Sequence, residues 1–134
     1  MTYTADAVAL LVYLVDSLPE TADRVFAEAE AGETIIQAPS TALAEVFYAI
    51  SRNKDVRGVR LDGSPEETRR ALVANGPVSV TPVAEQELAE YVQVIEDFNI
   101  HDGLIVASHY ARGTEAVITS DREIRDAGIP SIWD

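Results

Sequence analysis

Four acidic residues stand beside segments that the sequence predicts to be buried: Asp6, Glu45, Asp102 and Asp121. Charged side chains are rarely buried unless they are paired or bound to a metal ion. Carboxylate oxygens are the ligands that hard divalent cations such as Mg²⁺ prefer, and a cation removes the repulsion between converging acids. The pattern therefore predicts a metal pocket, and pockets of this type often serve phosphate chemistry.

The composition is that of a folded protein. The chain has 134 residues, of which 47% are hydrophobic, and we expect one compact domain over residues 1–134. The absence of cysteine excludes disulfides, zinc–thiolate sites and thiol catalysis. No apolar run approaches the ~18 residues that a membrane span needs, and the N-terminus lacks the basic start of a signal peptide. These features predict a cytoplasmic location.

The charge balance is strongly acidic. The chain has 23 acids against 10 bases, for a net charge of −13, and Lys54 is its single lysine. We interpret this surface as halophilic, an adaptation to molar salt, although an ordinary acidic protein is the alternative. Because acids are so common in this chain, we count only those flanked by core-like residues as evidence for a functional site. Seven glutamates on polar helical faces are expected to be solvated: Glu28, Glu30, Glu66, Glu67, Glu85, Glu87 and Glu90.

Strand-like and helix-like segments alternate along the chain. Strands are predicted at residues 2–6, 34–37, 78–83, 116–119 and 129–133, and helices at 7–18, 19–31, 40–52, 64–76, 84–98, 101–112 and 121–127. Ser40 and Ser64 are expected to cap two of these helices, and Gly113 to end another. This alternation is typical of an α/β domain built on a parallel sheet.

The predicted fold places the acids unequally. Ligands of parallel sheets bind beyond the carboxyl ends of the strands, where Asp6 and Asp121 both fall. Asp102 shares an apolar helical face with Ile105 and His109 and is expected to point inward. Glu45 lies in a helix that is apolar on nearly all sides, so periodicity leaves two alternatives open: it lines a cleft of small residues, or it faces water.

These segments resemble a PIN domain, the fold of VapC-type toxins, over nearly the whole chain. The matching pieces are Asp6 before Ala-Val-Ala-Leu-Leu, Glu45 in Leu-Ala-Glu-Val-Phe, Asp102 in His-Asp-Gly-Leu-Ile-Val-Ala-Ser, and Asp121 in Ile-Thr-Ser-Asp-Arg-Glu-Ile. The local match at Thr119–Asp121 is the most specific. Two positions depart from the family pattern: Gly103 stands where Ala is usual, and Glu123 where a further Asp is common, which leaves an accessory acid uncertain.

The resemblance implies a three-layer α/β/α fold with a central parallel sheet and a Mg²⁺- or Mn²⁺-dependent endoribonuclease. Asp6, Glu45, Asp102 and Asp121 would form the catalytic, metal-binding pocket, and Thr119 would support it through its hydroxyl. Hydrolysis would leave 5′-phosphate and 3′-hydroxyl ends. The resemblance also implies a homodimer and a cognate antitoxin protein that covers the acidic cleft.

Binding of RNA by so acidic a chain needs local positive charge. Six of the ten bases fall within residues 52–70, and four of them follow the Glu45 segment directly: Arg52, Lys54, Arg57 and Arg60. They could reach a phosphate backbone beside the pocket, or they could be solvated and paired with nearby acids. The aromatic residues are scattered and fit mostly a core, so the sequence indicates no stacking platform for single-stranded RNA.

Other functions fit the sequence less well. His101-Asp102 resembles the dipeptide of metal-dependent phosphohydrolases, but those enzymes also use upstream histidines, and this chain has none. A receiver-like or flavodoxin-like regulatory module would need a lysine after its last strand. A PIN-like protein that acts in RNA processing or assembly, without a toxin role, remains the main alternative.

Overall fold

The sheet consists of five short parallel strands whose residues are mostly β-branched or small. The computed structural model describes all residues, 1–134. The sheet has the order β5-β2-β1-β6-β7. Its strands are β1 (Thr2–Ala5), β2 (Ile35–Pro39), β5 (Val78–Thr81), β6 (Val117–Ile118) and β7 (Ser131–Ile132). Every pairing is parallel, which confirms the predicted sheet.

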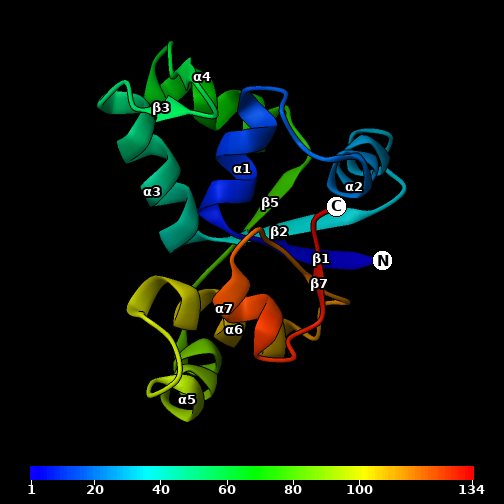
Figure 1. The fold of residues 1–134 in the computed structure, drawn as a ribbon, viewed down its shortest axis with the longest axis vertical. Helices are drawn as coiled ribbons and strands as arrows, with labels where there is room; N and C mark the ends of the chain where they lie inside the picture. Colours follow the sequence, from blue (N-terminus) through cyan, green and yellow to red (C-terminus); the bar gives the residue numbers. More distant parts are fainter.

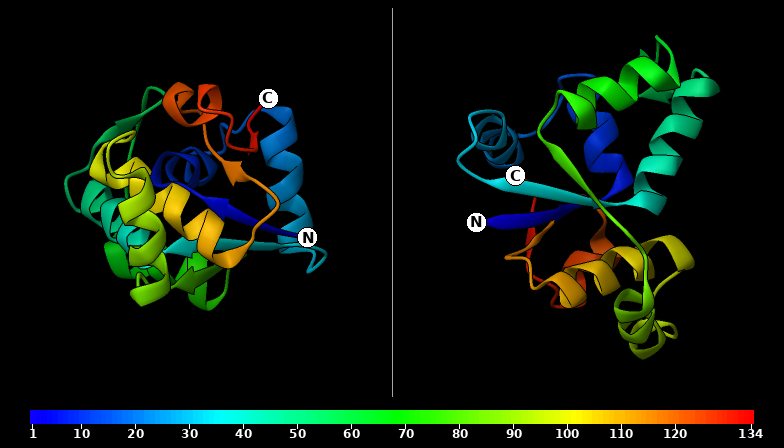
Figure 2. Two further views of the ribbon diagram at one scale, coloured as in Figure 1. Left: turned by 90° about the horizontal axis from the view of Figure 1, so that it is seen from below. Right: turned by 180° about the vertical axis from the view of Figure 1, so that it is seen from behind.

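Helices cover both faces of this sheet. In Figure 1 the sheet is seen nearly edge-on, with α1 to α4 above it and α5 and α6 below it, and Figure 2 shows the same division from behind. The helices are α1 (Ala7–Leu14), α2 (Glu20–Glu30), α3 (Ser40–Ser51), α4 (Pro65–Arg69), α5 (Glu85–Val94), α6 (Ile100–Arg112) and α7 (Arg122–Asp126). The predicted three-layer α/β/α architecture is thus confirmed. None of these helices is long and apolar enough to cross a membrane.

A core of 25 buried residues lies between the layers. Strand residues such as Ala5, Ile36 and Ile118 are fully buried, because both faces of a parallel sheet are covered by helices. Leu10 and Phe26 bring α1 and α2 into the same core. The core therefore joins the first strand and the last third of the chain, which is the packing that brings distant acids together.

Several helix boundaries differ from prediction; the predicted helix 84–98, for example, is observed as α5, Glu85–Val94. Three further differences follow from the local backbone conformation. The first helix ends at Leu14, since Asp16 adopts a positive φ of 54°. Pro39, in an extended conformation, is the N-cap of α3, so Ser40 lies inside the helix and does not cap it. The helix predicted to run to Gly76 divides into α4 and a π-helical turn, η1 (Arg70–Ala74). Ser64 does cap α4, and Gly113 ends α6 in the left-handed conformation, as predicted.

A small hairpin, β3 (Asp55–Val56) and β4 (Val59–Arg60), was not predicted. Its two-residue turn holds Arg57 at φ 52° and Gly58 at φ 79°. Turns of this kind need positive φ at both positions and favour Asn, Asp or Gly. Because Arg57 occupies a position where those residues are typical, the sequence pattern did not predict this hairpin. The hairpin follows α3 directly and sets the direction of the basic residues in this segment.

The prediction that Glu87 is solvated was wrong. Its side chain is 1% exposed, and its Oε2 lies 2.9 Å from Nε of Arg112 on α6. Its Oε1 also accepts a hydrogen bond from the backbone N–H of Ala84 at 2.9 Å. Buried carboxylates need such partners. The pair ties α5 to α6 and has no contact with the acidic cleft described next.

Candidate metal centre

Asp6 and Asp121 meet because β1 and β6 are adjacent and parallel. Ala5 pairs with Ile118, so the residues after each strand emerge at the same edge of the sheet. Asp6 is the N-cap of α1 and accepts from the N–H of Ala9 at 2.8 Å, and Asp121 is the N-cap of α7. Helix N-termini carry partial positive charge, which favours a carboxylate there. The carboxyl-end placement predicted from the sequence is what the structure shows.

Thr119 links these two acids through its hydroxyl. The residue is fully buried, its Oγ1 donates to Oδ2 of Asp6 at 2.5 Å, and it accepts from the N–H of Asp121 at 2.9 Å. One hydroxyl therefore positions a carboxylate and the backbone of a second acid. The structure gives Thr119 the supporting contacts that the resemblance implied.

Asp102 reaches the same place from the first turn of α6. Asn99, the N-cap, accepts from the N–H of Asp102 at 2.8 Å, and its Nδ2 donates to Oδ2 of Asp102 at 3.2 Å. Asn99 is a positioning residue that was not predicted from the sequence. An Asn three residues before an acid, at the start of an amphipathic segment, is the cap signal that could have found it.

The backbone of α6 comes unusually close to α5 just after Asp102. A Cβ atom added to Gly103 would lie 2.8 Å from Cε1 of Tyr91 and 3.2 Å from its Cδ1. Glycine therefore allows the Tyr91 ring to pack against the first turn of α6. This contact gives a physical reason for glycine at a position where the family pattern usually has alanine.

Glu45 lines the same cleft, which settles the alternative that the sequence left open. The cleft has a volume of about 170 Å³ and its wall includes all four predicted acids. Its lining residues are Asp6, Ala7, Val8, Thr41, Ala42, Glu45, His101, Asp102, Ile105, Ser120 and Asp121. Ala7, Thr41 and Ala42 are small, so the Glu45 carboxylate has room on this side of α3. Its Oε1 lies 2.5 Å from Nδ1 of His101, a contact that the sequence did not indicate.

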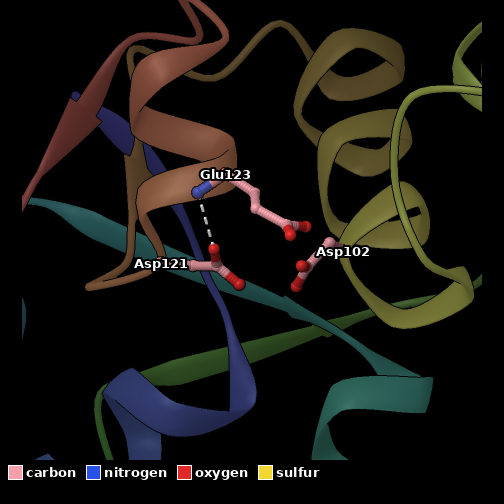
Figure 3. Close-up of side chains that lie close together, drawn as sticks. All are labelled: Asp102, Asp121 and Glu123. Carbon is pink, nitrogen blue, oxygen red and sulfur yellow. Dashed lines mark hydrogen bonds between the residues drawn. The ribbon is translucent and has the colours of Figure 1, made fainter.

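Glu123 joins Asp102 and Asp121 more closely than was expected. One oxygen from each of these three carboxylates lies within 4.8 Å of the others. Figure 3 shows the three side chains turned toward one another, with the N–H of Glu123 donating to Oδ1 of Asp121 at 2.8 Å. Asp6 and Glu45 border the same cleft but are not part of this closest trio. The sequence left the role of Glu123 uncertain, and the structure places its carboxylate beside those of Asp102 and Asp121.

The electrostatics of the cleft fit a bound cation. Burial raises the pKa of Asp6 to about 6, against the opposing hydrogen bonds from Thr119 and Ala9, while Asp121 and Glu45 raise it further. Burial also raises the pKa of Asp102 to about 7, and the hydrogen bond and charge of Asp121 add to the effect. No lysine or arginine lines the cleft. Apart from His101, which contacts Glu45, the clustered carboxylates have no basic partner, and they favour a divalent cation over an apolar or anionic ligand.

A Thr119→Val substitution should test this supporting network. It keeps the side-chain shape but leaves Asp6 without a donor and the N–H of Asp121 without an acceptor. We expect about 1–3 kcal/mol lower stability and about 10- to 100-fold weaker Mn²⁺ binding by titration calorimetry. Thr119→Ser, which retains the hydroxyl, should stay near wild type. Unchanged Mn²⁺ affinity in Thr119→Val would contradict a supporting role.

The four predicted RNA-contacting residues are placed differently from one another. Arg52 and Lys54 lie over the ring of Tyr48, beside the cleft, at 4.7 Å and 5.4 Å from its centroid. Arg57 instead lies over Trp133, and Arg60 faces a separate hollow formed with Asn53, Leu61 and Asp62. None of the four makes an ion pair, whereas Arg69 and Arg70 both pair with Glu66. The four cations are thus free of acidic partners within the chain.

Comparison with known proteins supports the architecture. No protein-family model matches the sequence, and no curated protein sequence matches it either. A chain in the structure of VapBC2 from Rickettsia felis, bound to a DNA fragment from their promoter, is 14% identical, with a TM-score of 0.73 and coverage of 100% of both chains. Mycobacterium tuberculosis VapC20, a Sarcin-Ricin loop cleaving toxin, is 16% identical, with a TM-score of 0.67 over 98% of this chain and 99% of that one. At these identities the likeness shows the fold, which is the PIN-domain α/β/α fold of such structures.

Proposed function

We propose that this chain is a metal-dependent endoribonuclease of the VapC type, the toxin of a type II toxin–antitoxin pair. One observation carries the proposal: Asp6, Glu45, Asp102 and Asp121 line a single cleft at the carboxyl ends of β1 and β6, and its lining includes no lysine or arginine. VapC20, which shares the fold, is a toxin that cleaves the Sarcin-Ricin loop. RNA is therefore the substrate class that we propose here.

The residues present would hold Mg²⁺ or Mn²⁺. Asp102, Asp121 and Glu123 supply the closest oxygens, and Asp6 and Glu45 add two further carboxylates to the lining of the cleft. Both Asp6 oxygens already accept hydrogen bonds, but a carboxylate has about four lone-pair sites and keeps capacity for a cation. When bound, the cation supplies Lewis-acid chemistry: it makes water more acidic and offsets negative charge on the phosphate.

The residues of the chain would orient the cleft carboxylates and would exclude part of the water around them. Thr119 and Asn99 hold Asp6 and Asp102 in fixed orientations through the hydrogen bonds described above. Ile105 and Ala42 give the cleft partly apolar walls, which reduce the screening of the buried Asp6 carboxylate by water. The carboxylates are therefore oriented before substrate arrives, which reduces the reorganisation that the reaction requires.

The partners follow from the same proposal. The likeness to the VapBC2 structure supports a cognate antitoxin, and we expect it to cover the acidic cleft with basic side chains. A homodimer is proposed by resemblance to the family. The halophilic interpretation also remains a prediction, because the acidic surface alone carries it.

The test is cleavage of a mixed RNA pool by purified, antitoxin-free protein in high-salt buffer. Parallel reactions would contain Mn²⁺, Mg²⁺ or a chelator. Cutting that requires metal and leaves 5′-phosphate ends is the expected result. A folded protein that binds Mn²⁺ calorimetrically but cuts no RNA under any of these conditions would count against the nuclease and favour a PIN-like protein of RNA processing or assembly.

A further inference from the structure

A groove continues from the acidic cleft between α1 and α3. Its volume is about 590 Å³, within the range of about 300–1,000 Å³ that is usual for small-ligand sites. It shares Ala7, Val8, Thr41, Glu45 and His101 with the cleft. Beyond these residues it is lined by Leu11, Ala44, Tyr48, Ala49 and Lys54. A ligand in the groove would therefore extend directly into the cleft.

An exposed aromatic ring, Tyr48, lines this groove but not the cleft. Tyr48 is 54% exposed, and it follows Glu45 by three residues, about 4.5 Å of helix rise. The aromatic residues were expected to belong mostly to the core, and Tyr48 is one that does not. The ring is a flat apolar surface within one helical turn of a cleft acid.

Positive charge is gathered at the same ring. The guanidinium carbon of Arg52 and the ammonium nitrogen of Lys54 lie 4.7 Å and 5.4 Å from the ring centroid. Neither cation has an acidic partner within the chain, although the net charge is −13. Cations held over a tyrosine ring are partly fixed in position. The groove thus has an acidic end at the cleft and a basic, aromatic end at Tyr48.

We infer that Tyr48, Arg52 and Lys54 form a nucleotide subsite, which binds the base and phosphate of one single-stranded RNA residue that flanks the scissile bond. The inference rests on the proposed nuclease function. Bases of single-stranded RNA stack on tyrosine rings and on arginine planes, and phosphates bind free cations. An apolar peptide would leave both cations without a counter-charge, so a nucleotide fits the whole set better than a peptide does.

The experiment measures RNA affinity by fluorescence anisotropy, with a short labelled single-stranded RNA and chelator present so that no cutting occurs. Tyr48→Ala should weaken binding by about tenfold, and Tyr48→Phe should bind within about twofold of wild type because it keeps the ring. Tyr110→Ala is the matched control, since Tyr110 is 47% exposed but lines neither the cleft nor the groove. Tyr48 is exposed, so its truncation is not expected to unfold the protein.

Two further measurements separate stacking from charge. An RNA with one abasic position should lose about the same tenfold with wild type, and this loss should disappear in Tyr48→Ala. Lys54→Ala should reduce the slope of log affinity against log salt by about 0.7, the value for one phosphate of a single strand. Wild-type RNA affinity in Tyr48→Ala would overturn the subsite and leave the groove for a protein partner.

The outcomes distinguish this subsite from the nuclease itself. Metal-dependent cutting together with normal RNA binding by Tyr48→Ala would overturn the subsite and leave the nuclease standing. Tyr48-dependent RNA binding without cutting would support the subsite and remove the nuclease. Titration of Mn²⁺ into Tyr48→Ala should give the wild-type affinity, and a large loss would mean that the substitution acts through the metal centre and not through stacking.

Discussion

Replacement of Asp102 by Asn should reduce metal-dependent RNA cleavage by at least about 1,000-fold, because one ligand of the closest carboxylate trio is lost. The fold should survive. Asn99 can still accept from the backbone N–H of residue 102, and the amide removes a carboxylate whose pKa is raised to about 7 by burial and by Asp121. Lower Mn²⁺ affinity and equal or higher stability should accompany the loss of activity.

The matched control is Asp23→Asn, an equally conservative change at an exposed position of α2 that lines no part of the cleft. It changes the net charge by the same amount and should leave cleavage and Mn²⁺ binding unaltered. Single-turnover cleavage and calorimetry would be measured on both variants. Full cleavage by Asp102→Asn would show that this acid is not part of the catalytic centre, whatever the fold resembles.

The strand-end acids were predictable from the sequence because their position depends on topology alone. Once β1 and β6 are parallel neighbours, Asp6 and Asp121 must meet at one edge of the sheet. Glu45 was not predictable in the same way. The α3 helix is apolar on most sides, and only its packing beside α1, with small residues at the contact, makes one of those sides a cleft wall.

The remaining errors arise where side-chain partners are distant in the sequence. The sequence pattern places Glu87 on a polar face of α5. The residue is nevertheless buried, because Arg112, 25 positions later, supplies its counter-charge. Tyr48 lies on an exposed side of α3 beside two cations, Arg52 and Lys54, and the sequence did not indicate this grouping. Neither outcome follows from periodicity, which describes one helix at a time and not what packs against it.

Without metal, the protein should lose stability as pH rises from about 4 to 7, and divalent cation should restore it. The folded pKa values of Asp6 and Asp102, about 6 and about 7, lie above the ordinary Asp value. Groups whose pKa is raised on folding contribute stability that is fully present below the unfolded pKa of about 4 and is lost as pH rises through the folded pKa. For the buried Asp6, a shift of about two units corresponds to at most about 3 kcal/mol.

The pH dependence of stability that Asp6 and Asp102 cause must be separated from the contribution of other titrating groups. Burial lowers the pKa of His109, so this residue affects stability in the opposite sense. Its contribution to the stability of the protein is present above the unfolded pKa of about 6.5 and is lost as pH falls through the folded pKa. The difference between wild type and Asp6→Asn/Asp102→Asn removes this shared background. Asn is also a good N-cap, so the double variant should retain α1. Urea denaturation is the appropriate probe, because guanidinium would screen the carboxylates.

The expected difference curve is near zero at about pH 4 and reaches at most about 3 kcal/mol in favour of the double variant by about pH 8, most of it from the buried Asp6, because Asp102 is partly exposed and its share is reduced by solvent screening. Mn²⁺ at about 100 times its dissociation constant should then stabilise wild type by about 2.7 kcal/mol and leave the double variant almost unchanged. A difference curve that stays flat across this range would mean that the cleft acids are well solvated and repel one another little. There would then be little repulsion between the cleft carboxylates for a cation to relieve. The proposal of a metal centre would have to rest on ligand geometry alone.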